Sequence, residues 1–337
     1  IDTDLNREVA FKVIRPGVQE EDATTPAAPV ELSAPPKDTP ASQAFETLKQ
    51  RFLQEAWVTG GLSHPGIVPV YELGQTPEGV PYYTMRFVKG ERTLADAIDE
   101  ARSKDLEERL KLLEPFLKVC DTLSYAHAQG VIHRDLKPDN IALGEFGEVV
   151  VIDWGLAKLA NQPDVAQERW QDRIQEYRDA TDLRTVASAM GTPGYMAPEA
   201  AKGQADQMDA RSDVYSLGAM LFQILTGRLP FEFTTFGELV MKLLREDPPE
   251  AMRIAEGVPA PLSRLCAECL AGDVGVRPAT ANALAQHVRD WQTQRARDRQ
   301  LEGHLRDARG ALETAETAVG EARIPPVERV AAALSLV

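Results

Sequence analysis

The sequence predicts an α+β fold in which strands come early and helices dominate the remainder. Residues 7–14 alternate as a half-buried strand does, and residues 81–90 read as a strand that runs into a glycine. A β-rich hairpin is expected over 141–152, whereas residues 213–225 and 265–270 have helical apolar spacing. With 337 residues, 43% of them hydrophobic, the chain can bury a large core, and one domain with added segments fits better than two independent domains.

The early elements are separated by a segment of unusual composition. Lys12 lies on the inward side of the strand at 7–14, and a helical pattern at 51–56 carries Glu55. Between them, residues 16–42 hold many prolines among alanine, threonine and acidic residues. Because this composition cannot bury enough apolar surface to offset the entropy of ordering, we expect a disordered insertion there.

The most informative segment is His-Arg-Asp-Leu-Lys-Pro-Asp-Asn at 133–140, which is followed by an Asp-Trp-Gly run that begins at Asp153. Phosphoryl transfer from a nucleotide needs a carboxylate to orient the attacking hydroxyl and a cation to neutralise the γ-phosphate. It also needs an Asn and an Asp to hold Mg²⁺ against the phosphate oxygens. Asp135, Lys137, Asn140 and Asp153 supply these groups at fixed offsets.

These motifs resemble the catalytic loop and the D-F-G motif of eukaryotic-type serine/threonine protein kinases of the bacterial style. The resemblance implies a two-lobed protein-kinase fold, with a small β-rich N-lobe that is incomplete here, a larger helical C-lobe and a C-terminal helical extension. It implies that Asp135 orients the substrate hydroxyl and that Lys137 helps to spread the transferring charge. Asn140 and Asp153 are the implied metal ligands. Trp154 replaces the phenylalanine of D-F-G, and because it can fill the same apolar slot we expect no loss of chemistry.

The resemblance also implies a nucleotide pocket. The strand at 7–14 matches the family's V-A-x-K strand, so Lys12 would contact the α- and β-phosphates and would pair with Glu55. Met85 would be the gatekeeper, backbone groups after it would bond the adenine edge, and two alanines would sandwich the base. The residues expected to bind ATP are Lys12, Ala10, Met85, Arg86, Val88, Ala142 and Asp153.

A Gly-Thr-Pro-Gly-Tyr-Met-Ala-Pro-Glu run ending at Glu199 resembles the end of a kinase activation segment. In the family this glutamate pairs with a late arginine, here Arg277, and an aspartate matching Asp213 ties down the catalytic loop. Lys137 together with Thr192 is the Ser/Thr-kinase form of these motifs. The resemblance therefore implies ATP-dependent transfer to Ser and Thr hydroxyls of protein substrates, with Mg²⁺ as the metal and Mn²⁺ as the alternative ion.

The activation segment, residues 153–199, is unusually long, and a short helix is expected around Trp170, Ile174 and Tyr177. Its hydroxyl groups are candidate phosphorylation sites. They compete with the simpler interpretation of a solvated loop that carries incidental hydroxyls.

Arg134, Thr185, Ser188 and Thr192 are the expected regulatory residues. Arg134 directly precedes the catalytic aspartate and could receive an activation-segment phosphate. We expect autophosphorylation in trans within 181–192, with Thr185 and Ser188 favoured as acceptors. By resemblance, Thr192 would contact the catalytic loop, so a phosphate there would block the substrate site.

The sequence leaves two alternatives to an active protein kinase open. No G-x-G-x-x-G precedes Lys12, which fits either a fragment whose first two strands lie upstream or a pseudokinase that signals by conformation. An inactive protein would not need all the residues expected to act on nucleotide, metal and acceptor, so their joint presence favours the fragment of an active enzyme. These residues are Lys12, Glu55, Asp135, Lys137, Asn140 and Asp153. A small-molecule kinase of similar fold ranks last, because that class lacks the activation segment found here.

Composition narrows the partners and the compartment. A net charge of −15 argues against nucleic-acid binding, and no apolar run is long enough to span a bilayer. Three cysteines provide no disulfide framework and suit a cytoplasmic protein. Cys266 and Cys269 have C-x-x-C spacing, but they lack a second ligand pair and lie in an apolar helical stretch, so we expect buried structural thiols.

The expected domain boundaries follow from these assignments. Residues 1–88 form a partial kinase N-lobe, 89–291 the C-lobe, and 292–337 a helical extension that could be a coiled coil. The extension has a short heptad seam formed by Leu301, Leu305, Ala308, Leu312, Ala315, Val319 and Ala322. The seam predicts either a homodimer or packing against another part of the protein.

Overall fold

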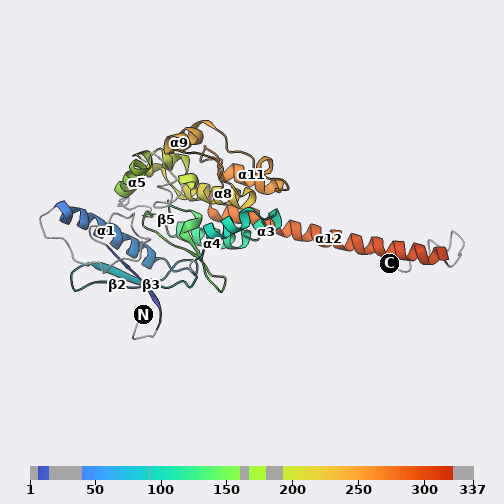
Figure 1. Ribbon diagram of the computed structural model, residues 1–337, viewed down its shortest axis with the longest axis horizontal. Helices are drawn as coiled ribbons and strands as arrows, with labels where there is room; N and C mark the ends of the chain where they lie inside the picture. Colours follow the sequence, from blue (N-terminus) through green and yellow to red (C-terminus); the bar gives the residue numbers. More distant parts are fainter. Residues whose placement is uncertain (1–6, 15–39, 91, 160–166, 180–192, 322–337) are drawn as a thin grey trace. The chain divides into compact units, whose positions relative to one another are not determined.

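The protein is described here by a computed structural model, which defines residues 7–14, 40–90, 92–159, 167–179 and 193–321 (Figure 1). By its contacts the chain divides into two units, Ile1–Ala285 and Gln286–Val337. Within the residues that the structure describes, no helix has both the length and the hydropathy required to cross a membrane.

The small lobe of the first unit is an antiparallel sheet with the strand order β1-β3-β2, packed on one long helix (Figure 1). Its elements are β1 (Val9–Val13), α1 (Pro40–Gly61), β2 (Val70–Gln75) and β3 (Pro81–Arg86). Three side chains of α1, those of Phe45, Phe52 and Ala56, are buried in a cluster with Tyr83 of β3 and Val80, which directly precedes β3. The apolar spacing along α1 therefore fixes which face of the helix lies on the sheet.

The helix α1 begins earlier than the sequence pattern indicated. It starts at Pro40, so residues 40–42 of the expected insertion are helical, and residues 15–39 lie outside the described part of the chain. Proline suits the first turn of a helix, because that turn has no intrahelical acceptor for its N–H. Phe45, one turn further, is buried in the lobe core and holds this end of the helix in place.

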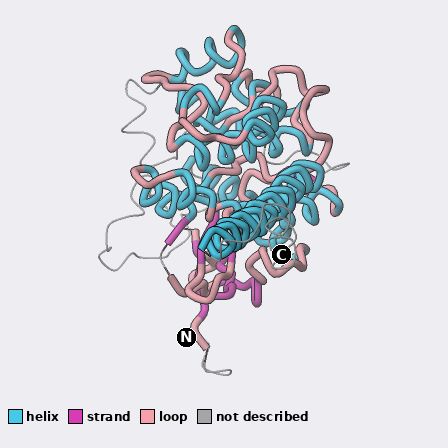
Figure 2. The backbone as a smooth tube through the Cα atoms, turned by 90° about the vertical axis from the view of Figure 1, so that its right-hand side faces the viewer, coloured by secondary structure: helices cyan, strands magenta, loops and turns pink. Residues whose placement is uncertain are grey.

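The large lobe is mainly helical, and Figure 2 shows its helices gathered on the side of the unit away from the strands near the N-terminus. Its helices are α2 (Leu94–Arg102), α3 (Leu106–Leu110), α4 (Leu113–Ala128), α5 (Gln167–Asp179), α7 (Pro198–Ala201), α8 (Ala210–Thr226), α9 (Phe236–Arg245), α10 (Ala251–Ile254) and α11 (Ala260–Cys269). Short 3₁₀ turns are η2 (Pro138–Asn140), η3 (Pro193–Tyr195) and η4 (Ala205–Gln207).

The helix α8 is the centre of this lobe. Almost all of its residues are buried, as expected for a helix that is apolar on every side. Asp209 caps its first turn, and Gly227 ends it in the left-handed conformation, with φ of 72°. Gly218 allows α11 to approach closely, because a Cβ added there would lie 2.4 Å from Cys269 Cβ.

The catalytic segment is framed by short strands, of which the first precedes α2 and the others lie between α4 and α5 in the chain. These are β4 (Arg92–Thr93), β5 (Val131–Ile132), β6 (Ile141–Leu143), β7 (Val149–Val151) and β8 (Lys158–Leu159). The expected hairpin over 141–152 is present, since β6 and β7 pair antiparallel with Ile141 opposite Val151. Cys266 and Cys269 are buried free thiols, and among the described residues no cluster of three or more His, Cys, Asp or Glu side chains could hold a metal ion.

The last helix, α12, spans Ala281–Glu321, and its residues from 286 onward belong to the second unit. This helix is continuous through the boundary that we placed at residue 291. Leu301, Leu305 and Leu312 of the heptad seam are exposed. The residues after Glu321, including the end of the seam, lie outside the described part of the chain. Dimerisation through this seam remains a prediction.

Candidate active site

The catalytic loop brings three of the expected side chains together. Lys137 Nζ lies 3.1 Å from Asp135 Oδ2. The Asn140 side-chain nitrogen donates to the Asp135 carbonyl oxygen at 2.8 Å and to its carboxylate at 3.2 Å. With its nitrogen turned to Asp135, the Asn140 carboxamide presents its oxygen on the other side. An oxygen donor in that position suits Mg²⁺, which prefers oxygen ligands.

The loop is held by a buried carboxylate beneath it. Asp213 accepts hydrogen bonds from the backbone N–H groups of His133 and Arg134, each at 2.9 Å, and lies 2.8 Å from His127 Nε2. Arg134 adopts a φ of 68°, which L-residues rarely do, so these bonds offset local backbone strain. Burial raises the pKa of Asp213, but the hydrogen bonds and charges of His127 and His133 lower it by more, so the net shift of this pKa is downward.

The segment that follows the β6–β7 hairpin places Asp153 at the surface beside the loop. Asp153 also has a positive φ, 62°, and its carboxylate is solvent-exposed. Trp154 is buried, donates to the Val151 carbonyl oxygen at 3.2 Å and packs its ring 4.7 Å from that of His133. Trp154 therefore fills an apolar slot, as the sequence indicated. The carboxylate of Asp153 and the carboxamide of Asn140 both offer oxygen donors, the ligand type that Mg²⁺ prefers.

The small lobe supplies the expected ion pair. Lys12 Nζ of β1 lies 2.5 Å from Glu55 Oε1 of α1. A third member, Tyr83 of β3, donates its hydroxyl to the same oxygen at 2.9 Å. Burial, followed by the charge of Glu55, raises the pKa of Tyr83, so the phenol stays a donor. Sequence analysis missed Tyr83, although Tyr83 stands directly opposite Lys12 in the sheet register.

Most of the residues expected around the base lie on strands β1, β3 and β6. Ala10 pairs with Met85 across β1 and β3, and Met85 packs against the lobe core. The Arg86 N–H donates to the Pro69 carbonyl oxygen at 3.1 Å, so a contact from Arg86 to a base would have to use its carbonyl oxygen. Val88 follows β3, and Ala142 lies on β6.

The end of the activation segment is fixed by a buried ion pair. Both terminal nitrogens of Arg277 donate to the carboxylate of Glu199, at 2.8 and 3.0 Å, and Ser212 Oγ donates to it at 2.6 Å. The Glu199–Arg277 pair is the one that the family resemblance implied. Burial raises the pKa of Glu199, but the hydrogen bonds and charge of Arg277 outweigh it, so the net shift is downward.

The expected helix in the activation segment is α5, and it brings an unexpected residue to the site. Arg173 Nη1 lies 2.8 Å from Asp135 Oδ2, the oxygen that also faces Lys137. Burial raises the pKa of Asp135, but the cations of Arg173 and Lys137 lower it more, so the carboxylate is ionised. The signal in the sequence was the apolar spacing of Trp170, Ile174 and Tyr177, which marks a helix face that packs on the protein.

The regulatory residues are only partly within the described chain. Arg134 is 5% exposed, and its Nη2 donates to the Ala205 carbonyl oxygen at 2.9 Å. Thr185, Ser188 and Thr192 lie outside the described residues.

The bilobed fold and the anchored catalytic loop define the class of protein, and comparison with known families agrees. Residues 35–288 match the protein kinase domain family, so the chain belongs to that family. Members of the family generally use ATP and Mg²⁺. Lys12 precedes the matched range, and its place in the site therefore rests on its contact with Glu55.

Among curated proteins, the chain is similar to serine/threonine-protein kinases named PknD. The protein of Protochlamydia amoebophila is 36% identical over 259 residues, which cover 72% of this chain and 26% of that protein. The protein of Chlamydia muridarum is 39% identical over 229 residues, covering 62% and 24% respectively. The protein of Chlamydia pneumoniae is 34% identical over 248 residues, covering 72% and 26%. The chain thus spans about a quarter of the length of these relatives.

Proposed function

We propose that this domain transfers the γ-phosphoryl group of ATP to Ser and Thr hydroxyls of protein substrates. The observation that carries the proposal is the Lys12–Glu55 pair, formed at 2.5 Å in the same unit as a catalytic loop that joins Asp135, Lys137 and Asn140. Separate segments of this unit thus supply the kinds of side chain that phosphoryl transfer requires.

Each side chain has a distinct task in this proposal. Asp135, with its pKa below the ordinary value, accepts a hydrogen bond from the substrate hydroxyl and takes its proton late in the transfer. Lys137, next to it, stabilises the charge on the transferring group. Lys12 contacts the nucleotide phosphates, and Asn140 with Asp153 would hold Mg²⁺, which neutralises charge on the β- and γ-phosphates when bound.

A protein substrate is favoured over a small molecule by the ordered end of the activation segment. Tyr195 Oη donates to Gln223 at 2.6 Å, and Ser216 Oγ donates to the Tyr195 carbonyl oxygen at 2.8 Å. With the Glu199–Arg277 pair, these bonds fix residues 193–199 on α8 beside Asp135 and give a platform for a peptide. A pseudokinase would need no such intact platform next to intact catalytic groups.

Asp135→Asn tests the assignment with the full-length purified protein. It should abolish most transfer of ³²P from ATP to a mixed Ser/Thr protein acceptor while leaving nucleotide affinity within about twofold, because Asp135 acts on the acceptor. Asp153→Asn should weaken Mg²⁺-dependent nucleotide binding as well. Asp247→Asn, at an exposed position on the loop after α9, is the matched control. Transfer by Asp135→Asn at the parental rate would show that the assignment is wrong.

We also propose that the domain phosphorylates its own activation segment in trans within 181–192, at Thr185 and Ser188 before Thr192. Support comes from Arg134, a buried cation next to the catalytic aspartate, for which a phosphate is a suitable anionic partner. Peptide mass spectrometry after incubation with Mg·ATP tests the proposal. An active protein with no phosphate in that window, or full activity in Arg134→Ala, would refute it.

A further inference from the structure

The helix α5 is docked on the protein through one apolar face. Trp170, Ile174 and Tyr177 recur at helical spacing, and each is at most 3% exposed. The Tyr177 ring stacks on Phe236 of α9, with the ring centroids 5.4 Å apart. A helix of this length has little stability alone in water, so its helical state depends on this docking.

Two consecutive residues of α5 form ion pairs, one with the small lobe and one with the catalytic loop. Asp172 forms an ion pair with Arg51 of α1 at 3.0 Å, one helical turn before Glu55. Arg173 forms an ion pair with Asp135 at 2.8 Å and is also hydrogen-bonded to Tyr177. The side chain of Arg173 is 15% exposed, so its charge lies largely within the protein. The helix therefore contacts both the small lobe, through Arg51, and the catalytic loop, through Asp135.

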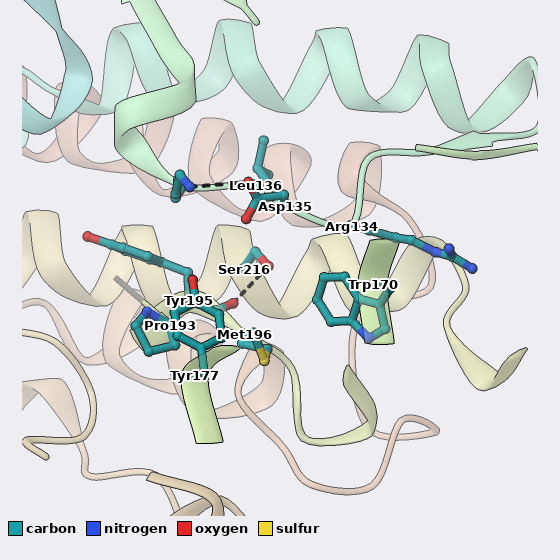
Figure 3. Close-up of a pocket in the computed structure, with 10 residues that line it drawn as sticks. Arg134, Asp135, Leu136, Trp170, Tyr177, Pro193, Tyr195, Met196 and Ser216 are labelled. Atoms are coloured by element: carbon teal, nitrogen blue, oxygen red, sulfur yellow. Dashed lines mark hydrogen bonds and ion pairs between the residues drawn. The ribbon is translucent and has the colours of Figure 1, made fainter. Parts of the chain in front are cut away.

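Little room remains at Asp135 when α5 is docked. Trp170 and Tyr177 line a cavity together with Arg134 and Asp135 (Figure 3), and this cavity has a volume of about 10 Å³. A cavity of this size holds no more than about one water molecule. Arg173 Nη1 already contacts Asp135 Oδ2, so a Ser or Thr hydroxyl carried on a peptide would have to displace Arg173 to bond to that oxygen.

We propose that α5 is an inhibitory segment that occupies the protein-substrate site, with Arg173 in the place of the acceptor hydroxyl. This inference rests on the proposed kinase function. The block acts on the acceptor and not on the nucleotide, because the Lys12–Glu55 pair is intact while α5 is docked. Docking also carries a cost that favours release of the helix, because among the described residues Trp170 Nε1 is buried without a hydrogen-bond partner.

Arg173→Ala tests the proposal in the full-length protein after phosphatase treatment. The substitution removes a charge-assisted hydrogen bond to Asp135, which shifts a docking equilibrium by roughly tenfold or more. We expect kcat/KM for myelin basic protein to rise by about tenfold, with the KM for ATP unchanged within about twofold. Arg178→Ala is the matched control, because Arg178 is an exposed arginine on the same helix.

A second variant and a second measurement separate inhibition from a loss of fold. Trp170→Ala removes the apolar anchor and should raise kcat/KM in the same direction. Hydrogen exchange of the amides in 167–179 should become faster in both variants and stay slow in Arg178→Ala, whether or not the protein is catalytically active.

The outcomes distinguish this inference from the proposed function. A parental protein that transfers phosphate, together with an Arg173→Ala variant no faster than Arg178→Ala, overturns the inhibitory role and leaves the kinase function standing. Unchanged exchange in 167–179 overturns the docking. Failure of every variant to transfer phosphate, with α5 released, overturns the kinase function and the inhibitory role with it.

Discussion

Asp213→Asn should destabilise the fold more than the same substitution at Asp209, the N-cap residue of the same helix. In the carboxylate, Oδ1 accepts from the Arg134 N–H, and Oδ2 accepts from the His133 N–H and faces His127. An asparagine has one oxygen, so either orientation of its amide directs an NH₂ group at one of the two backbone N–H groups. One buried donor then loses its acceptor, which costs about 1–3 kcal/mol.

The remaining bonds also weaken in the variant. Hydrogen bonds to an ionised acceptor are roughly twice as strong as those to a neutral one, so conversion to an amide weakens the surviving bond to the loop. The backbone of Arg134 is strained, with φ of 68°, and the weaker hydrogen bonds offset less of this strain. Together these effects predict a loss of about 3 kcal/mol in the free energy of unfolding.

Urea denaturation followed by circular dichroism measures this loss, with an unchanged m-value as the test that both states are comparable. Asp209→Asn is the control. Asp209 caps the same helix, and asparagine caps as well as aspartate does. Its ion pair with Arg211 is half-exposed, so the control should lose less than about 1 kcal/mol. An Asp213→Asn protein within error of the control would refute the anchoring argument.

Three further predictions concern the large lobe. Arg277→Met leaves the Glu199 carboxylate buried without its cation and should lower the free energy of unfolding by about 3–5 kcal/mol in urea titrations. Because the folded-state pKa of Glu199 is lowered, its stabilising contribution is present at neutral pH and is lost as the pH falls below the ordinary glutamate range toward the folded pKa. Glu199→Gln, although less stable at pH 7, should therefore lose less stability over that acid range, and an equal loss would contradict the assignment. Gly218→Ala forces a methyl group against Cys269 and should lower the melting temperature with a loss of about 1–3 kcal/mol, and a thermal scan that matches the parent would contradict the close α8–α11 packing.

The sequence was most informative where a function needs several side chains within a few residues. Asp135, Lys137 and Asn140 lie in one loop, so their proximity follows from short-range geometry once the motif is seen. The sequence could not predict the Arg173–Asp135 contact, because it depends on where a helix docks. Tyr83 was missed for a related reason. Its bond to Glu55 depends on the β1–β3 register, which local patterns leave open.

The shared oxygen of Glu55 has a consequence for how the small lobe is organised. Lys12 and Tyr83 stand opposite each other on neighbouring strands, and both donate to Glu55 Oε1. The neutral hydroxyl of Tyr83 links α1 to the sheet by a hydrogen bond that does not involve the charge of Lys12. In this lobe α1 is therefore joined to the sheet by a neutral hydrogen bond as well as by the ion pair, so one of its two links does not depend on the charge of the lysine.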